Sequence, residues 1–178
     1  MPLLAEHVEK TVRFCSVYGV VVFMLVLSTV SLSLPISGAI EIPFLLMVIY
    51  YWSVYRPTLL PPWLVFVLGL VFDILSGLPL GLSALIFLGM RWVIVDQRLF
   101  LMGQSFMMIW IGYAFASFMG IMMQWALYGL LGLHWPPLEG AVIMFFAGIL
   151  LYPLVSMILH LSHRLLPSHD DDFGLVIK

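Results

Sequence analysis

Few residues of this 178-residue chain could carry chemistry, and Asp73 is the foremost of them. It lies within an apolar segment, where a carboxylate could contact a ligand or partner, or move a proton or an ion. It also lies shortly before Gly77, where the chain turns toward the next predicted helix. The free N–H groups and the positive dipole end of that helix would face the same turn. The spacing therefore favours a structural role, in which the carboxylate of Asp73 holds the turn Asp73–Gly81 together.

The other ionisable residues do not assemble into a catalytic or metal site. Counting about 1.5 Å per helical residue from the turn leaves Arg91 roughly 10 Å from the level of Asp73, so we expect its side chain to reach lipid headgroups instead. His160 and His163 share a helical face, but a third metal ligand is missing. No phosphate loop, nucleophile elbow or zinc signature is present. We therefore expect no enzymatic activity, no cofactor and no metal.

The composition indicates that these residues belong to an integral membrane protein. The chain is 63% hydrophobic and 9% charged, with a mean hydropathy of +1.15, which is more apolar surface than a water-soluble core of this size can absorb. The length favours a single domain over residues 1–178. No basic stripe suits nucleic acid, and the single cysteine, Cys15, excludes a disulfide within one chain.

The apolar runs predict an all-α fold, a bundle of six transmembrane helices that uses nearly the whole chain. Short tails remain at residues 1–13 and 164–178. The C-terminal tail contains the acidic run Asp170–Asp172. Acidic runs of this kind are usually exposed to solvent. The predicted spans cover about residues 14–34, 42–56, 62–76, 80–95, 99–131 and 138–163.

The basic residues orient these spans. With six crossings, all seven lie in loops or tails on one side, or within about one turn of a helix end there. Positive charge of this kind marks the cytoplasmic side, so we expect a multi-pass protein of the bacterial inner membrane with both termini in the cytoplasm. The seven are Lys10, Arg13, Arg56, Arg91, Arg98, Arg164 and Lys178.

The second and third spans leave an alternative open, because each contains only about fourteen apolar residues, or about 21 Å of helix. They could form a hairpin that enters the bilayer and returns without crossing it. Arg56 would then lie inside the bilayer, at a cost of about 2.5–3.5 kcal/mol, so the six-span topology is favoured. The aromatic residues near these span ends, among them Tyr50, Tyr51 and Trp52, suggest interfacial belts.

Small residues recur every fourth position in the fifth span, at Gly112, Ala116 and Gly120. Such spacing lets two helix backbones approach closely. The partner could be another helix of the same bundle, or the transmembrane helix of a second protein. We take this small-residue face as a candidate partner-helix face.

The central part of the chain contains a two-part motif. Its first part is Tyr51-Trp52-x-x-Tyr55-Arg56-Pro57. The second part is Gly69-Leu70-x-x-Asp73-x-Leu75-x-Gly77-x-Pro79-Leu80-Gly81-x-x-Ala84-Leu85, and Gln97-Arg98 follows it. This motif resembles that of the MreD family of bacterial rod-shape-determining membrane proteins. The resemblance covers about residues 45–100 in detail, and elsewhere it is compositional.

This resemblance implies a non-enzymatic subunit of the cell-elongation (rod) complex, which helps to regulate cell shape and peptidoglycan synthesis. Such subunits associate with the bitopic membrane protein MreC, and together they connect MreB filaments to a cell-wall glycosyltransferase and transpeptidase. The implied fold is similar to the substrate-binding subunit of energy-coupling-factor vitamin transporters. The family motif corresponds here to Arg56, Pro57, Asp73, Gly77, Pro79 and Gly81, which we interpret as architectural.

The shared fold keeps a second function open, a small-molecule-binding subunit of an energy-coupling-factor-type transporter. Those subunits carry an Ala-x-x-x-Ala docking motif on the first span, and the first predicted span here contains no alanine. The sequence therefore favours the scaffold. An intramembrane enzyme is a third possibility, but Asp73 has no evident catalytic partner at matching depth.

Overall fold

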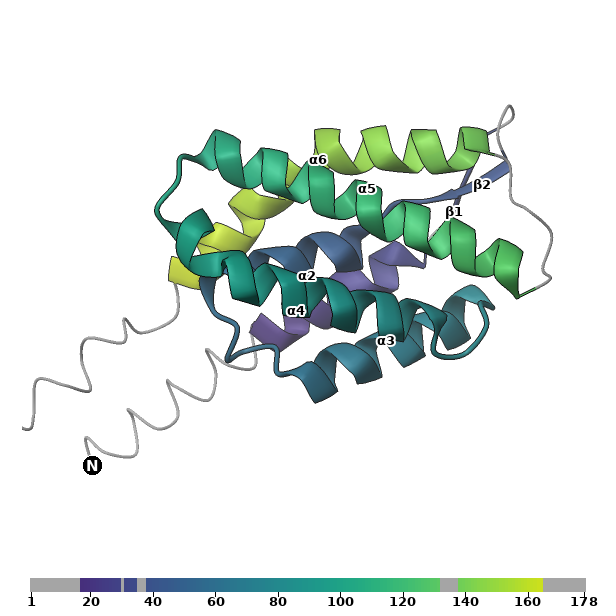
Figure 1. Ribbon diagram of the computed structural model, residues 1–178, viewed down its shortest axis with the longest axis horizontal. Helices are drawn as coiled ribbons and strands as arrows, with labels where there is room; N and C mark the ends of the chain where they lie inside the picture. The colour runs from purple at the N-terminus through teal and green to yellow at the C-terminus, as the bar shows by residue number, and fades with distance from the viewer. Residues whose placement is uncertain (1–16, 30, 35–37, 132–137, 165–178) are drawn as a thin grey trace, which may run out of the picture.

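The structure, a computed structural model, describes residues 17–29, 31–34, 38–131 and 138–164. Within these residues the chain forms six helices and one short antiparallel hairpin of strands. The expectations for Cys15, for the N-terminal tail and for the run Asp170–Asp172 lie outside the described residues. The helices run roughly along a common long axis, and consecutive helices alternate in direction (Figure 1).

The N-terminal helix, Val17–Ser28, ends earlier than the predicted span. Ser28 Oγ donates to the carbonyl of Met24 at 3.0 Å, and Thr29 Oγ1 donates to that of Val26 at 2.7 Å. Hydroxyl side chains of this kind offer the backbone an alternative to helical bonding. The alternation Ser-Leu-Ser-Leu that follows has the two-residue period of a strand, and it forms β1 (Ser31–Leu34).

Strand β1 pairs antiparallel with β2 (Gly38–Glu41), with Ser31 opposite Glu41 and Leu34 opposite Gly38. The prediction of an all-α fold is thus correct for the bundle and wrong for this hairpin, which was expected to be the end of a span and a loop. The hairpin packs beside α6 (Leu138–Arg164).

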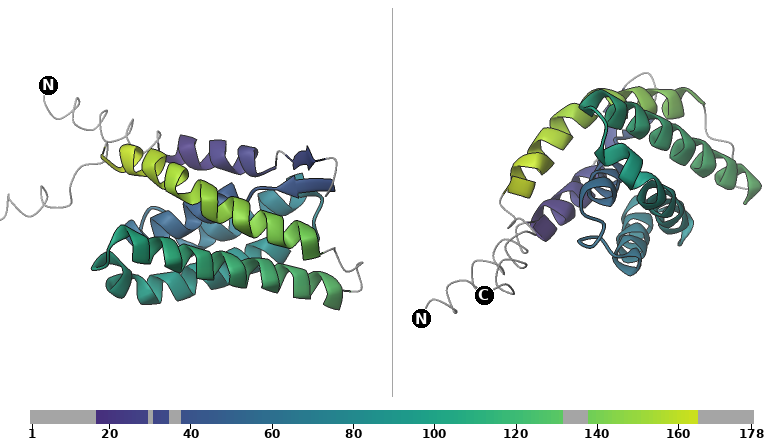
Figure 2. Two further views of the ribbon diagram at one scale, coloured as in Figure 1. Left: turned by 90° about the horizontal axis from the view of Figure 1, so that it is seen from above. Right: turned by 60° about the vertical axis from the view of Figure 1, so that its left-hand side comes forward.

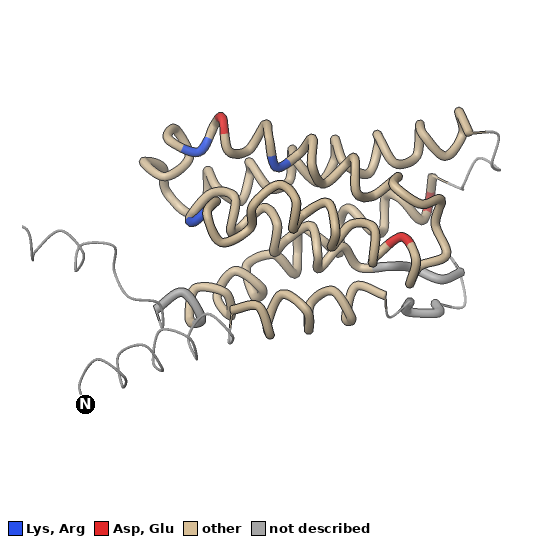
Figure 3. Tube along the Cα trace, turned by 90° about the horizontal axis from the view of Figure 1, so that it is seen from below, with Lys and Arg blue, Asp and Glu red and all other residues tan. Residues whose placement is uncertain are grey.

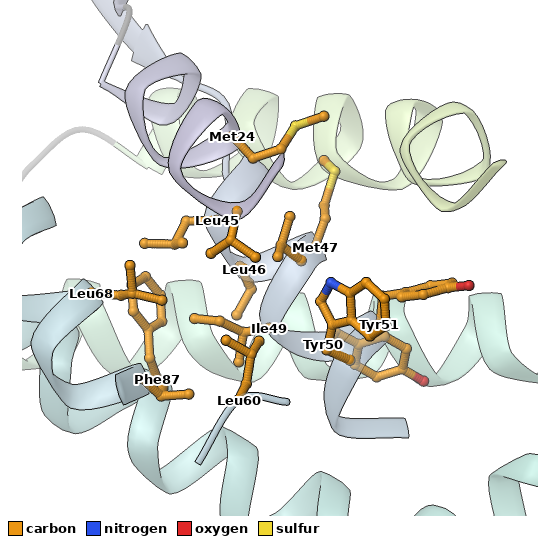
Figure 4. Packing of buried hydrophobic residues seen from close by; sticks show 14 of the residues in the cluster. Met24, Leu45, Leu46, Met47, Ile49, Tyr50, Tyr51, Leu60, Leu68 and Phe87 are labelled. Atoms are coloured by element: carbon orange, nitrogen blue, oxygen red, sulfur yellow. The ribbon is translucent and has the colours of Figure 1, made fainter. Parts of the chain in front are cut away.

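Helix α2 (Phe44–Tyr55) forms the centre of the bundle. Every residue from Leu45 to Val54 is buried, and a helix that is apolar on all sides requires such enclosure. It lies between the N-terminal helix and α4 (Leu82–Met102), and it also contacts α5 (Phe106–Leu130) and α6 (Figure 2). Figure 4 shows its side chains radiating toward Met24, Leu68 and Phe87 of three other helices.

Helix α3 (Pro62–Ser76) has the bounds expected for the third span, because Pro61 and Pro62 begin it and Gly77 ends it. The boundary between α4 and α5 differs from the prediction. The fourth span was predicted to end near residue 95, but helix α4 continues through the charged residues Asp96 and Arg98 to Met102. These side chains do not stop a helix; the break comes at Gly103 and at Ser105, whose backbone is extended at ψ 157°.

Candidate functional site

Asp73 is fully buried near the end of α3, and its carboxylate reaches the beginning of α4. Oδ2 accepts a hydrogen bond from the backbone N–H of Gly81 at 2.8 Å, and Oδ1 accepts one from that of Ser83 at 3.0 Å. Helix α4 has no capping side chain of its own at Gly81. Asp73 therefore supplies the cap from the neighbouring helix, which is the bonding that its position in the sequence suggested.

Two glycines shape the turn that Asp73 closes. Gly77 ends α3 with φ +67°, and its N–H and that of Leu78 both donate to the carbonyl of Asp73. Gly81 begins α4 with φ +92°. These left-handed conformations are strained for residues with a Cβ atom. The backbone N–H of Leu82, which follows Gly81, donates to the carbonyl of Pro79 at 3.1 Å.

The same two helices meet at Gly69 and Ala84. A Cβ atom placed on Gly69 would overlap Cα of Ala84 and would lie 2.8 Å from its backbone nitrogen. The absence of a side chain at Gly69 is thus what allows α3 and α4 to approach so closely. Gly69, Asp73, Gly77, Gly81 and Ala84 form one unit, which we call the α3–α4 hairpin.

Arg91 does not extend toward solvent or headgroups as predicted; it is 9% exposed. Its Nε donates to the carbonyl of Leu60 at 2.7 Å, and its Nη2 donates to that of Pro57 at 3.0 Å. These carbonyls belong to the turn between α2 and α3, and Tyr18 Oη donates to the carbonyl of Leu59 there at 3.2 Å. The free carbonyls of an irregular turn attract a guanidinium that lies within reach.

The small-residue face of α5 points into the bundle rather than outward. A Cβ atom on Gly112 would lie 2.5 Å from Tyr50 Oη, and one on Gly120 would lie 2.8 Å from Met90 Sδ. Ala116 is partly buried against the same core. Side chains of α2 and α4 thus occupy this face, which corresponds to the internal-packing alternative. Gly120 is buried there, whereas Gly112 and Ala116 remain partly exposed, so the role of this face as a partner-helix face stays a prediction.

A cluster of buried tyrosines joins three helices and was not anticipated. Tyr113 of α5 stacks on Tyr152 of α6 at 4.2 Å between ring centroids, and Tyr50 of α2 meets both rings edge-on at 5.5 and 5.8 Å. Tyr50 Oη donates to the carbonyl of Ile109 at 2.9 Å. Because Tyr50, with Tyr51 and Trp52, is at most 2% exposed, its expected place in an interfacial belt is wrong. The sequence signal that could have revealed this cluster is the position of Tyr113 and Tyr152, each of which lies well inside an apolar run.

Among the described residues, no group of three or more His, Cys, Asp or Glu side chains could hold a metal ion. A cavity of about 20 Å³ lies beside α2, with Ser28 and Gln124 as its polar lining residues. That volume is close to what one water molecule needs and far below the 300–1,000 Å³ of typical ligand pockets.

The comparisons with known proteins found no similarity on which to build. No family model matches the chain, and neither a curated protein nor a solved structure matches it. The fold and the site together define a helical bundle that encloses α2 and contains the α3–α4 hairpin. Two of its described helices, α5 and the Leu138–Leu161 part of α6, are long and apolar enough to cross a membrane.

Proposed function

We propose that this protein is a multi-pass membrane scaffold of the bacterial cell-elongation complex, similar to MreD, which holds an MreC-like bitopic protein in the inner membrane. Membrane location is the first part of the proposal. Monomeric soluble proteins rarely expose large continuous apolar surfaces. Here many large apolar side chains on α5 and α6 are at least 47% exposed, among them Ile111, Phe115, Phe118, Phe146, Leu150, Leu154 and Met157.

The distribution of charge supports the orientation. Arg56 follows α2, Arg98 lies in the last turns of α4, and Arg91 bonds to the turn between α2 and α3, so the described basic residues share one end of the bundle. Asp73 and Glu139 lie toward the opposite end, at the end of α3 and the beginning of α6 (Figure 3). We assign the basic end to the cytoplasm, together with both termini.

The observation that carries the scaffold function is the use of the motif residues within the α3–α4 hairpin. Both oxygens of Asp73 accept backbone N–H groups, and Gly77 and Gly81 adopt left-handed conformations that the turn requires. The residues that resemble the MreD motif thus have an architectural use, as expected of a protein whose task is to hold others. The cavity beside α2 is too small for a vitamin, so it does not itself supply the ligand pocket that the transporter alternative requires.

Affinity purification tests this proposal. The tagged protein is expressed at native level in its own bacterium and extracted in mild detergent, and co-purifying proteins are identified by mass spectrometry. A tagged polytopic membrane protein of equal abundance serves as the control. We expect specific recovery of an MreC-like protein and of the cell-wall synthases, with MreB recovered indirectly. Recovery of an ATPase pair with a transmembrane coupling subunit would instead establish the transporter.

A further inference from the structure

Pro153 interrupts the bonding of α6 in the middle of its 27 residues. Proline has no backbone N–H, so the carbonyl of Ile149, four residues earlier, loses its helical donor. The indole Nε1 of Trp110 on α5 donates to that carbonyl at 3.0 Å. A side chain of the neighbouring helix thus supplies the hydrogen bond that the proline removes.

The turn after Pro153 is weakened as well. Ser156 Oγ donates to the carbonyl of Pro153 at 2.8 Å, which competes with the helical bond to that carbonyl. Helices usually kink where a proline or an inserted side chain interrupts the backbone ladder. Both conditions hold within one turn of α6, so this is the part of the helix where bending requires the fewest backbone bonds to change.

The residue before the proline connects this joint to the core. Tyr152 is fully buried and stacks on Tyr113, while its hydroxyl has no hydrogen-bond partner among the described residues. A buried unpaired hydroxyl disfavours the arrangement that contains it. Beyond the joint, Val155 and Leu159 face the core, whereas Leu154 and Met157 are 62% and 75% exposed.

We propose that α6 is a hinged helix with its joint at Pro153, and that Trp110 is the latch that holds the joint closed. In the closed state the indole N–H of Trp110 bonds to the carbonyl of Ile149, and Tyr152 stays stacked on Tyr113. When the latch opens, the segment after Pro153 swings away from α2 and α5, which uncovers Val155 and Leu159. The device depends on contacts within this chain and stands whether or not the scaffold function is correct.

Spin-label distance measurements test the hinge in the purified full-length protein. Labels are attached at Leu99→Cys on α4 and Met157→Cys on α6, both exposed, in a Cys15→Ser background. Trp110→Phe removes the donor and keeps an aromatic ring, and Trp92→Phe, at a site 77% exposed, is the matched control. We expect Trp110→Phe to raise the population with the longer distance about fivefold, the factor that one net hydrogen bond gives, and Trp92→Phe to leave it unchanged.

Pro153→Ala provides the second arm, because an alanine at this position regains the N–H that bonds to the carbonyl of Ile149. In that background the longer distance should disappear, and adding Trp110→Phe should not restore it. An unchanged distance distribution in Trp110→Phe would overturn the proposal. So would an equal effect of Trp110→Phe with and without Pro153, because the indole would then act through packing alone. If Trp110→Phe fails to fold, rescue by Pro153→Ala supports the latch and failure of rescue contradicts it.

Discussion

At the scale of single residues, each charged group within the core of the described bundle bonds to backbone rather than to an opposite charge. Asp73 accepts two N–H groups at the start of α4, and Arg91 donates to two carbonyls of the turn between α2 and α3. Hydrogen bonds to ionised groups are among the stronger ones in proteins. The two residues therefore fasten the two ends of α3, one end each.

Replacement of Asp73 tests this fastening. Asn retains one acceptor oxygen but presents an NH₂ group to the second backbone N–H, so Asp73→Asn should lower the free energy of unfolding by about 1–2 kcal/mol. Asp73→Leu leaves both N–H groups unpaired and should cost about 3 kcal/mol or more. Thermal unfolding in mild detergent should rank wild type above Asn and Asn above Leu. Equal midpoints for the three proteins would contradict the structural role.

At the scale of helices, the sequence indicates the ends of elements well where a backbone constraint marks them. Pro61, Pro62 and Gly77 delimit α3 as expected. Charge was a poorer guide, because the span predicted to end near residue 95 continues as α4 through Asp96 and Arg98. A charged residue indicates where the chain is expected to leave the apolar phase. A helix, by contrast, ends where its backbone can no longer adopt helical geometry.

The faces of the helices were harder to predict than their ends. The spacing of Gly112, Ala116 and Gly120 is the same whether the helix that covers them belongs to this chain or to another. Similarly, the composition of an aromatic segment does not tell an interfacial ring from a buried one, and Tyr50 proved to be buried. Both questions depend on which helices become neighbours, and this depends on contacts between residues far apart in the chain.

The contact between α3 and α4 gives a prediction at this scale. Gly69→Ala should destabilise the protein by about 1–3 kcal/mol, because the new methyl group would overlap the backbone of Ala84. Gly89→Ala is the matched control, since a Cβ atom there has nothing within 4 Å. Its effect should be neutral or slightly stabilising. The two variants are compared by their thermal unfolding midpoints and by their accumulation in the membrane. Equal midpoints for Gly69→Ala and Gly89→Ala would contradict the close approach of α3 and α4.

At the scale of the whole molecule, apolar side chains fill the core and also cover much of the outer surface. Helix α2 is enclosed by its neighbours, while α5 and α6 present Phe115, Phe146 and Leu150 on their outer surfaces. Exposure of these apolar side chains to water would be strongly unfavourable, whereas their exposure to hydrocarbon would not be.

Membrane extraction provides the corresponding prediction. The protein should remain in the membrane pellet after washing with alkaline carbonate, which removes peripheral proteins, and it should be released by mild detergent. A soluble protein and a known multi-pass protein of the same cells serve as controls. Release by carbonate would contradict the membrane location and, with it, the proposed scaffold function.

The enclosure of α2 also has a consequence for synthesis. The bonds of Asp73 span ten residues, so they can form as soon as the ribosome has released the start of α4. The rings around Tyr50 come from α5 and α6, and Tyr152 is translated late. Throughout that interval α2 exists as a completed helix whose neighbours are partly missing. In an unfinished or truncated chain α2 therefore lacks part of its packing, and a stop codon before α6 should lead to rapid degradation.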